Sequence, residues 1–171
     1  RQLLGHLTTI EALQEAKPQI VEELGHERGR AVITYLQFTI DKILDYNSRQ
    51  TLWDTTRGVV RHVFTRHDFS FKWTFGEMVH SGPSSGLRWA ISQVLDSLDG
   101  ICDLSSQRTE KRLSGNDLSV TNSSATNFKQ IEDQSVDAVV MDPPYYNNVQ
   151  YNELSDFFYV WQKRTLGDLY P

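Results

Sequence analysis

Residues 135–145 have the sequence Ser-Val-Asp-Ala-Val-Val-Met-Asp-Pro-Pro-Tyr, and this stretch decides which fold the chain is expected to have. The run 136–141 is rich in β-branched residues, which is typical of a strand buried in a parallel sheet. The string Asp-Pro-Pro-Tyr at 142–145 follows directly, and open α/β sheets place their ligands at the carboxyl ends of such strands. A given four-residue string occurs by chance in a chain of this length with a probability on the order of 10⁻³. We therefore interpret 142–145 as a functional motif at the end of a strand.

Helical patterns surround this stretch on both sides. Apolar residues at helical spacing predict helices over 3–24, 27–47, 87–103 and 151–165. Pro18 is expected to kink or divide the first helix, and Gly25 is expected to end it. Because the first two helices are long and meet at a glycine, they are predicted to form an antiparallel hairpin. The Gly- and Ser-rich segment 81–86 is predicted to be a loop.

The region between the second and third helices combines basic and aromatic residues. A further helix is predicted over 55–65, with Asp54 as its N-cap. On this helix Arg57 and Arg61 would share one face, and with Arg66 they are candidate contacts to nucleic-acid phosphates. The alternative is a solvated basic face over core aromatics. The segment 69–75 alternates aromatic and polar residues, which favours an extended conformation.

The composition excludes several classes of protein. The chain has 171 residues, of which 39% are hydrophobic and 23% are charged, and it contains no apolar run long enough to span a membrane. Its single cysteine excludes an internal disulfide and a cysteine-rich zinc site, and the histidines have no metal-ligand spacing, so no metal is expected. The net charge of −5 argues against binding nucleic acid by bulk positive charge but permits a local basic stripe. We expect a cytoplasmic protein; the sequence sets no oligomeric state.

The residue types at 142–145 fit one kind of chemistry. The exocyclic amine of a nucleobase is a poor nucleophile because its lone pair is delocalised into the ring. The Asp142 carboxylate and the Pro143 carbonyl can both accept hydrogen bonds from that amine, which favours a localised lone pair as the amine attacks a methyl sulfonium. Pro144 restricts Pro143, so that its carbonyl is held rigidly. Tyr145 offers an aromatic face on which an extruded base can stack.

These residues resemble a known family. The Asp-Pro-Pro-Tyr string is similar to motif IV of S-adenosylmethionine (AdoMet)-dependent amino-methyltransferases. The longer stretches 142–146 and 151–161 resemble large prokaryotic adenine-specific DNA methylases that are associated with a Zn-ribbon. Similarity to the same family extends to stretches upstream, at 1–4, 35–48, 64–73 and 84–86. The resemblance implies an α/β fold, with a mostly helical region over 1–115 and a partial Rossmann-like methyltransferase sheet over 116–171.

The resemblance also implies site residues and a cofactor. AdoMet is the expected cofactor, with Asp142 and Ser124 on its side of the site, although Ser124 is explained almost as well as a plain loop serine. Tyr146 and Asn147 are expected to close over a flipped base or, alternatively, to cap the next helix. The family binds AdoMet through a glycine-rich loop, and no Gly-x-Gly occurs among the ten glycines here, nor is there a Zn-ribbon. We therefore expect a fragment whose missing loop lies before Arg1 in a longer parent, and which is inactive alone.

Three functions remain open at this point. The first is methyl transfer to adenine N6 in DNA, with DNA as the partner and no membrane association. The second is methylation of a different amine, either cytosine N4 or guanine N2 of RNA, because related enzymes use similar motifs. The third is a non-catalytic nucleic-acid-binding module that retains a decayed catalytic segment.

Overall fold

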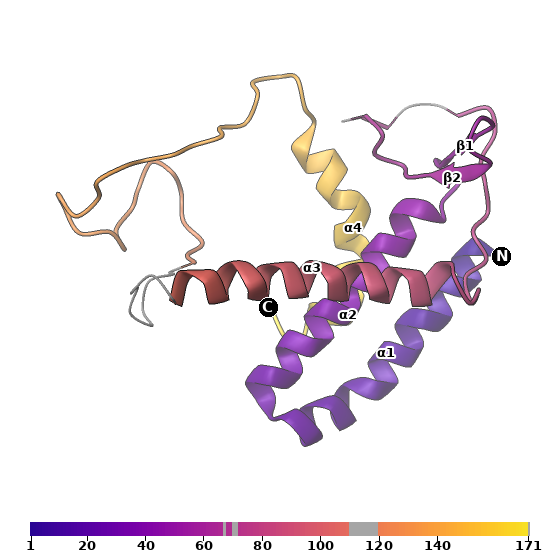
Figure 1. Cartoon of the computed structure of the whole chain (residues 1–171), viewed down its shortest axis with the longest axis horizontal. Helices are drawn as coiled ribbons and strands as arrows, with labels where there is room; N and C mark the ends of the chain where they lie inside the picture. The colour runs from indigo at the N-terminus through magenta and orange to yellow at the C-terminus, as the bar shows by residue number, and fades with distance from the viewer. Residues whose placement is uncertain (67, 70–71, 110–119, 171) are drawn as a thin grey trace.

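The computed structural model describes residues 1–66, 68–69, 72–109 and 120–170, and for 105–109 the backbone only. Helices dominate these residues, and their one sheet has two strands (Figure 1). The elements in chain order are α1 (Gln2–Leu24), α2 (His26–Tyr46), β1 (Leu52–Asp54), β2 (Val59–Arg61), α3 (Gly86–Thr109) and α4 (Tyr151–Leu166). The four long helices predicted from the sequence are confirmed, and the class is mixed α and β with helices dominant.

The predicted antiparallel hairpin of α1 and α2 is confirmed, and it turns at Gly25 (Figure 1). Gly25 has φ 77°, a conformation that glycine adopts without a steric penalty. Its N–H donates to the Val21 carbonyl at 2.9 Å, and its own carbonyl accepts from the Gly29 N–H at 2.8 Å. One residue therefore ends the first helix and begins the second, which sets the two helices side by side.

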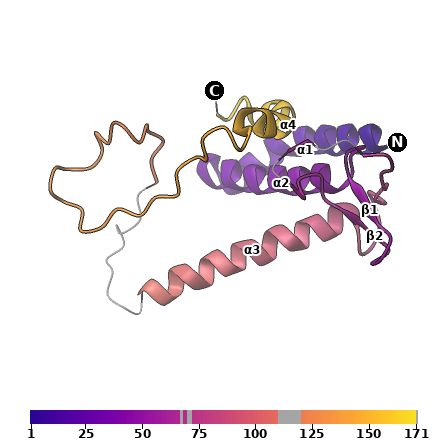
Figure 2. The same cartoon turned by 90° about the horizontal axis from the view of Figure 1, so that it is seen from above.

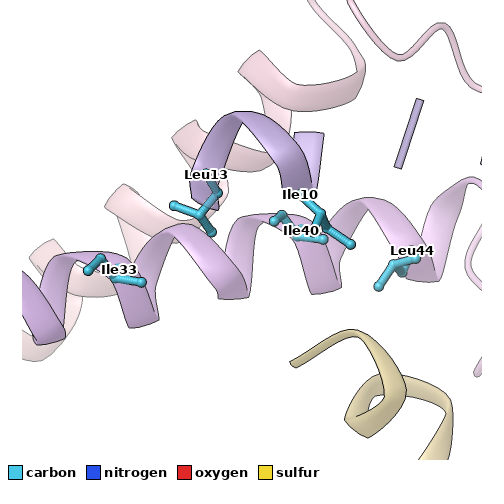
Figure 3. Packing of buried hydrophobic residues seen from close by; sticks show 5 residues of the cluster. All are labelled: Ile10, Leu13, Ile33, Ile40 and Leu44. Atoms are coloured by element: carbon cyan, nitrogen blue, oxygen red, sulfur yellow. The ribbon is translucent and has the colours of Figure 1, made fainter. Parts of the chain in front are cut away.

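The core lies along this hairpin. Ile10 and Leu13 of α1 are buried against three buried residues of α2: Ile33, Ile40 and Leu44 (Figure 3). Pro18 was expected to kink or divide the first helix, and α1 continues through it undivided. A proline removes one helical hydrogen bond, but Ile20 and Val21 beyond it pack against the core. We attribute the continuity of the helix to this packing.

The helix α2 lies at the centre of the molecule. In Figure 2, α1 and α4 lie on one side of it and α3 lies on the other. Phe157 and Trp161 of α4 pack against the core of the helical hairpin, as expected for the apolar face of that helix. On the opposite side the Trp89 ring of α3 meets the Tyr46 ring edge-on, with 4.9 Å between centroids. Thus α4 packs on the helical region, although it comes from the segment 116–171 that was predicted to form part of a methyltransferase domain. The predicted domain boundary at residue 115 stays a prediction.

A buried polar network fixes how α4 sits on α2. The Thr165 hydroxyl of α4 donates to the Gln37 side-chain carbonyl, and Gln37 in turn donates to the Asp41 carboxylate at 2.8 Å. Gln162 donates to the other oxygen of Asp41 at 2.7 Å. Burial raises the pKa of Asp41, while the hydrogen bonds from Gln162 and Gln37 act in the opposite direction. Because each buried group has a partner, the network favours one register of α4 on α2.

The helix predicted over 55–65 is wrong, because this region forms a β-hairpin. The strands β1 and β2 are antiparallel, and Trp53 pairs with Val60 across them. Asp54 does act as a cap, but of a turn: its carboxylate accepts the Thr56 and Arg57 N–H groups at 3.0 and 3.2 Å. Gly58, with φ 63°, closes that turn before two β-branched valines. Capping residues serve turns as well as helices, and here the positive φ and the valines favour the hairpin.

The buried strand predicted over 136–141 is not formed. Residues 120–150 run as an irregular, exposed excursion from the helical body (Figures 1 and 2), and Val140 is 95% exposed. A parallel strand needs hydrogen-bonded neighbours on its edges, and no described residues lie beside this stretch as a strand. The described residues therefore contain no Rossmann-like sheet. Of the strand expected at 118–120, only Val120 is among them, and it is exposed and not in a strand.

The accessible surface area of the chain is larger than that of a compact monomer of the same mass. Its accessible area is 13700 Å², whereas a compact monomer of this mass exposes about 8,600 Å². Residues 120–150 and the far half of α3, which extend away from the helical body (Figure 2), contribute to this area; Ile101 and Leu104 of α3 are exposed. Among the described residues, no helix combines the length and apolar character that crossing a membrane requires.

Candidate functional site

The Asp-Pro-Pro-Tyr string lies at the end of the excursion, six residues before α4 begins. The Asn148 N–H donates to the Tyr145 carbonyl at 3.2 Å, so the chain turns directly after the motif. Asn147 sits in this turn with φ 56°, a left-handed conformation that asparagine tolerates better than most residues. The Tyr145 N–H donates to the hydroxyl of Tyr151 at 3.3 Å. Because Tyr151 is the first residue of α4, this contact ties the motif to the start of that helix.

The motif residues are accessible rather than enclosed. Tyr145 is 58% exposed and Tyr146 is more exposed still, while Asp142, Pro143 and Pro144 are all exposed. Within the described residues, no hydrogen bond occupies the Asp142 carboxylate, so both of its oxygens can accept from a ligand. The Tyr145 ring likewise presents a face on which a base can stack. The arrangement can therefore bind an amine but does not surround it.

Ser124 and Asp142, the two candidate cofactor residues, are not brought together by any hydrogen bond in the part of the chain that is described. The Ser124 hydroxyl is occupied locally, because it accepts the Thr126 N–H at 3.3 Å and lies 2.9 Å from the Thr126 hydroxyl. A hollow of about 990 Å³ lies within the loop 125–141. The walls of this hollow are the exposed backbone and side chains of that single loop, so it reflects unpacked chain and not a built pocket.

The three candidate phosphate-binding arginines lie on or just after the β-hairpin. Arg57 is in its turn, Arg61 ends β2, and Arg66 follows; all three are exposed. Arg57 and Arg61 do not share a helical face, because no helix forms there. Within the described ranges none of the three forms an ion pair with a carboxylate. Their guanidinium groups are thus accessible to an anionic partner.

An aromatic cluster joins this basic segment to α4. The Phe64 ring lies 5.2 Å from the Phe157 ring and 5.4 Å from the Phe158 ring, measured between centroids. Phe69 adds contacts to Phe64 at 5.5 Å and to Phe157 at 6.0 Å. The expected aromatics of the basic segment are therefore divided: Phe64 packs inward, Trp73 is exposed, and Phe71 lies outside the described residues. The cluster places the basic segment beside the helix that follows the motif.

Sequence reasoning missed three parts of this arrangement. The contact of Tyr151 with the motif backbone spans a turn, and no pattern in the sequence marks it. The exposure of Trp53 and Phe75 was not predicted, because the sequence pattern favoured a helix at 55–65 and gave no reason to connect the two residues. The third missed part is the β-hairpin itself. The β-branched pair Val59 and Val60, directly after Gly58, is the sequence signal that could have identified it.

Two histidines with lowered pKa values, His6 and His80, lie away from the motif. His6 of α1 is buried, its Nε2 lies 2.8 Å from the Asn47 carbonyl oxygen, and its ring is 5.4 Å from that of His80. Burial lowers the pKa of His6, and the neighbouring His80 lowers it further against the hydrogen bond to Asn47. Burial also lowers the pKa of His80. No group of three or more potential ligands for a metal ion gathers within the part of the chain that the structure describes.

The lowered pKa values predict that acid destabilises the fold. A histidine whose pKa is lower in the folded state than its unfolded value of about 6.5 binds its proton preferentially when unfolded. Its contribution to stability is complete above that value and is lost as the pH falls below it towards the folded-state pKa. We expect the midpoint of urea unfolding to decrease from pH 7.5 to pH 5.5, and His6→Gln to reduce this decrease. His26→Gln, at an exposed position, is the control; equal pH dependence in both variants would contradict the prediction.

The chain was compared with known proteins at the levels of sequence family, curated sequence and solved structure. No family model, no curated protein and no solved structure matches it.

Proposed function

We propose that this chain is part of an AdoMet-dependent DNA amino-methyltransferase that acts on the exocyclic amine of a flipped base, with adenine N6 as the target. The observation that carries the proposal is the Asp-Pro-Pro-Tyr string, with an unoccupied carboxylate at Asp142 and a backbone tied to α4 through Tyr151. The exposed side chains of Arg57, Arg61 and Arg66 support nucleic acid as the substrate. The choice of adenine and of DNA rests on the family that the residues resemble.

The proposed chemistry of this chain concerns the amine. The Asp142 carboxylate and the Pro143 carbonyl would each accept a hydrogen bond from the NH₂ group. This localises its lone pair and stabilises the positive charge that develops on nitrogen during attack. The Tyr145 ring would stack on the extruded base and so hold the amine at a fixed distance. Tyr146 and Asn147, in the turn after the motif, would lie against the same base.

The residues of this chain do not form a complete cofactor site. The sequence has no Gly-x-Gly loop, and the Ser124 hydroxyl is engaged in its own turn. We therefore assign the methyl donor to a longer parent protein and derive no step through it here. In that parent, residues 116–150 would become part of a Rossmann-like sheet once neighbouring strands are present. We place the parent in the cytoplasm.

The test is transfer of an isotope-labelled methyl group from AdoMet to unmethylated duplex DNA by the parent protein. Asp142→Ala is expected to reduce the transfer at least about 100-fold, because removing one preorganised electrostatic partner of a transition state typically has an effect of this size. Asp156→Ala changes an exposed carboxylate on α4, outside the motif, and serves as the matched control. Equal transfer by the two variants would exclude the proposed role of Asp142.

A further inference from the structure

The β-hairpin presents a half-exposed aromatic surface that the motif does not use. Trp53 is 44% exposed and Phe75 is 43% exposed. The two residues are held near each other by the backbone: the Thr51 hydroxyl donates to the Gly76 carbonyl at 3.1 Å, and Gly76 lies against Val60 and Trp53 of the hairpin. A Cβ added at Gly76 would stand 2.4 Å from Val60 and 3.5 Å from the Trp53 ring. The segment ending at Phe75 is therefore packed closely along the hairpin.

Arginines border this surface. The guanidinium of Arg49 lies over the Phe75 ring, 5.7 Å from its centroid, and Arg57 occupies the hairpin turn. Both are exposed, and neither has a carboxylate partner within the residues described. The Asp54 carboxylate, the acidic group nearest to Arg57 in the sequence, is held by three hydrogen bonds within the turn. Trp53 and Arg57 of the hairpin, together with the neighbouring Phe75 and Arg49, thus combine two aromatic rings with two accessible cations.

Charge is segregated in the same place. Residues 49–75 contain five arginine and lysine residues against two aspartates and so carry +3, whereas the remainder of the chain carries −8. An acidic chain that concentrates positive charge in the segment 49–75 favours an anionic partner at that segment. Exposed aromatic rings beside cations are the arrangement with which proteins bind single-stranded nucleic acid, because unpaired bases stack while phosphates meet the cations. In a duplex the base faces are already stacked on one another, so they are not available to stack on protein side chains.

We propose that the β1–β2 hairpin binds single-stranded DNA, with bases stacked on Trp53 and Phe75 and phosphates at Arg49 and Arg57. The proposal rests on the proposed function only in naming DNA as the polymer. The aromatic cluster of Phe64 and Phe157 joins the hairpin segment to α4.

The experiment is a fluorescence anisotropy titration of the 171-residue chain with a labelled single strand of mixed sequence, without AdoMet and at several salt concentrations. Trp53→Ala should weaken binding roughly tenfold, and Trp53→Phe, which keeps a stacking ring, should restore most of it. Arg49→Gln with Arg57→Gln should reduce the slope of log affinity against log salt by about 1.4. Circular dichroism of each variant checks that the helices are retained.

Matched controls remove equivalent groups elsewhere. Arg28→Gln with Arg88→Gln removes the same charge from exposed positions on α2 and α3, and Tyr159→Ala removes an exposed ring on α4. These variants should bind like the parental chain. The proposal is overturned if the hairpin variants bind like the controls, if the parental chain does not bind the single strand, or if duplex DNA or polyglutamate binds more tightly. The binding experiment contains no methyl donor, so its outcome is independent of methyl transfer. A failure to bind the single strand would not exclude the role of Asp142, and a failure of methyl transfer would not exclude binding at the hairpin.

Discussion

Replacing Ile40 with alanine is expected to lower the free energy of unfolding by about 2–5 kcal/mol, the range typical of such truncations in a core. Ile40 is 2% exposed at the centre of α2, in the cluster that joins α2 to Ile10 and Leu13 of α1. The alanine would remove apolar surface from that contact and leave a cavity that the two helices can close only by moving. The core is small for a chain of this length, so the loss is a large part of the total stability.

Urea unfolding followed by far-ultraviolet circular dichroism measures this effect. Val32→Ala is the control, because Val32 lies on the same helix but is exposed. A surface truncation of this kind is expected to change stability by no more than about 0.5 kcal/mol. If Ile40→Ala and Val32→Ala unfold at the same urea concentration, the α1–α2 interface is not the core of the fold.

Replacing Gly86 with alanine is expected to destabilise the docking of α3 by at least about 2 kcal/mol. Gly86 begins α3 with φ 59°, a left-handed conformation that is strained for alanine. In addition, a Cβ there would stand 2.0 Å from the His80 carbonyl oxygen, which accepts the Leu87 N–H at 2.9 Å. The added Cβ would therefore collide with the His80 carbonyl, which accepts a hydrogen bond at the start of α3. A backbone carbonyl cannot rotate aside as the end of a flexible side chain can.

The matched control is Gly100→Ala in the same helix. An added Cβ at Gly100 meets nothing within 4 Å, so alanine there is expected to stabilise α3 by roughly 0.5–1 kcal/mol through its higher helix propensity. The two glycine substitutions should thus shift the midpoint of urea unfolding in opposite directions. Shifts in the same direction would show that the entry into α3 is not built as described.

The helices could be predicted from the sequence because their apolar periodicity is local. The stripe that includes Ile10 and Leu13, and the glycine at position 25, were sufficient to predict the paired helices. The hairpin at 52–61 could not be predicted in the same way, because Asp54 can cap a helix or a turn equally well. What decides between them is the local pairing of Trp53 with Val60, together with the contact with Gly76, which lies well beyond the hairpin along the chain.

At 136–141 the local sequence predicted a strand that the structure does not contain. Its composition is typical of a buried parallel strand, but a strand forms only against neighbours, and the described residues offer none beside it. For the candidate site, the sequence identifies the motif at 142–145, since that depends on residue order alone. The tie between Tyr145 and Tyr151, and the aromatic cluster from Phe64 to α4, are products of packing and required the structure.

The most direct test of the central claim is to identify the nucleoside that is modified. The parent protein is incubated with isotope-labelled AdoMet and either unmethylated duplex DNA or tRNA, and each nucleic acid is then digested and its nucleosides separated by mass. We expect labelled N6-methyldeoxyadenosine from the DNA, and its loss in the Asp142→Ala protein. Label confined to tRNA, or no label in either nucleic acid while the protein still binds DNA, would contradict it.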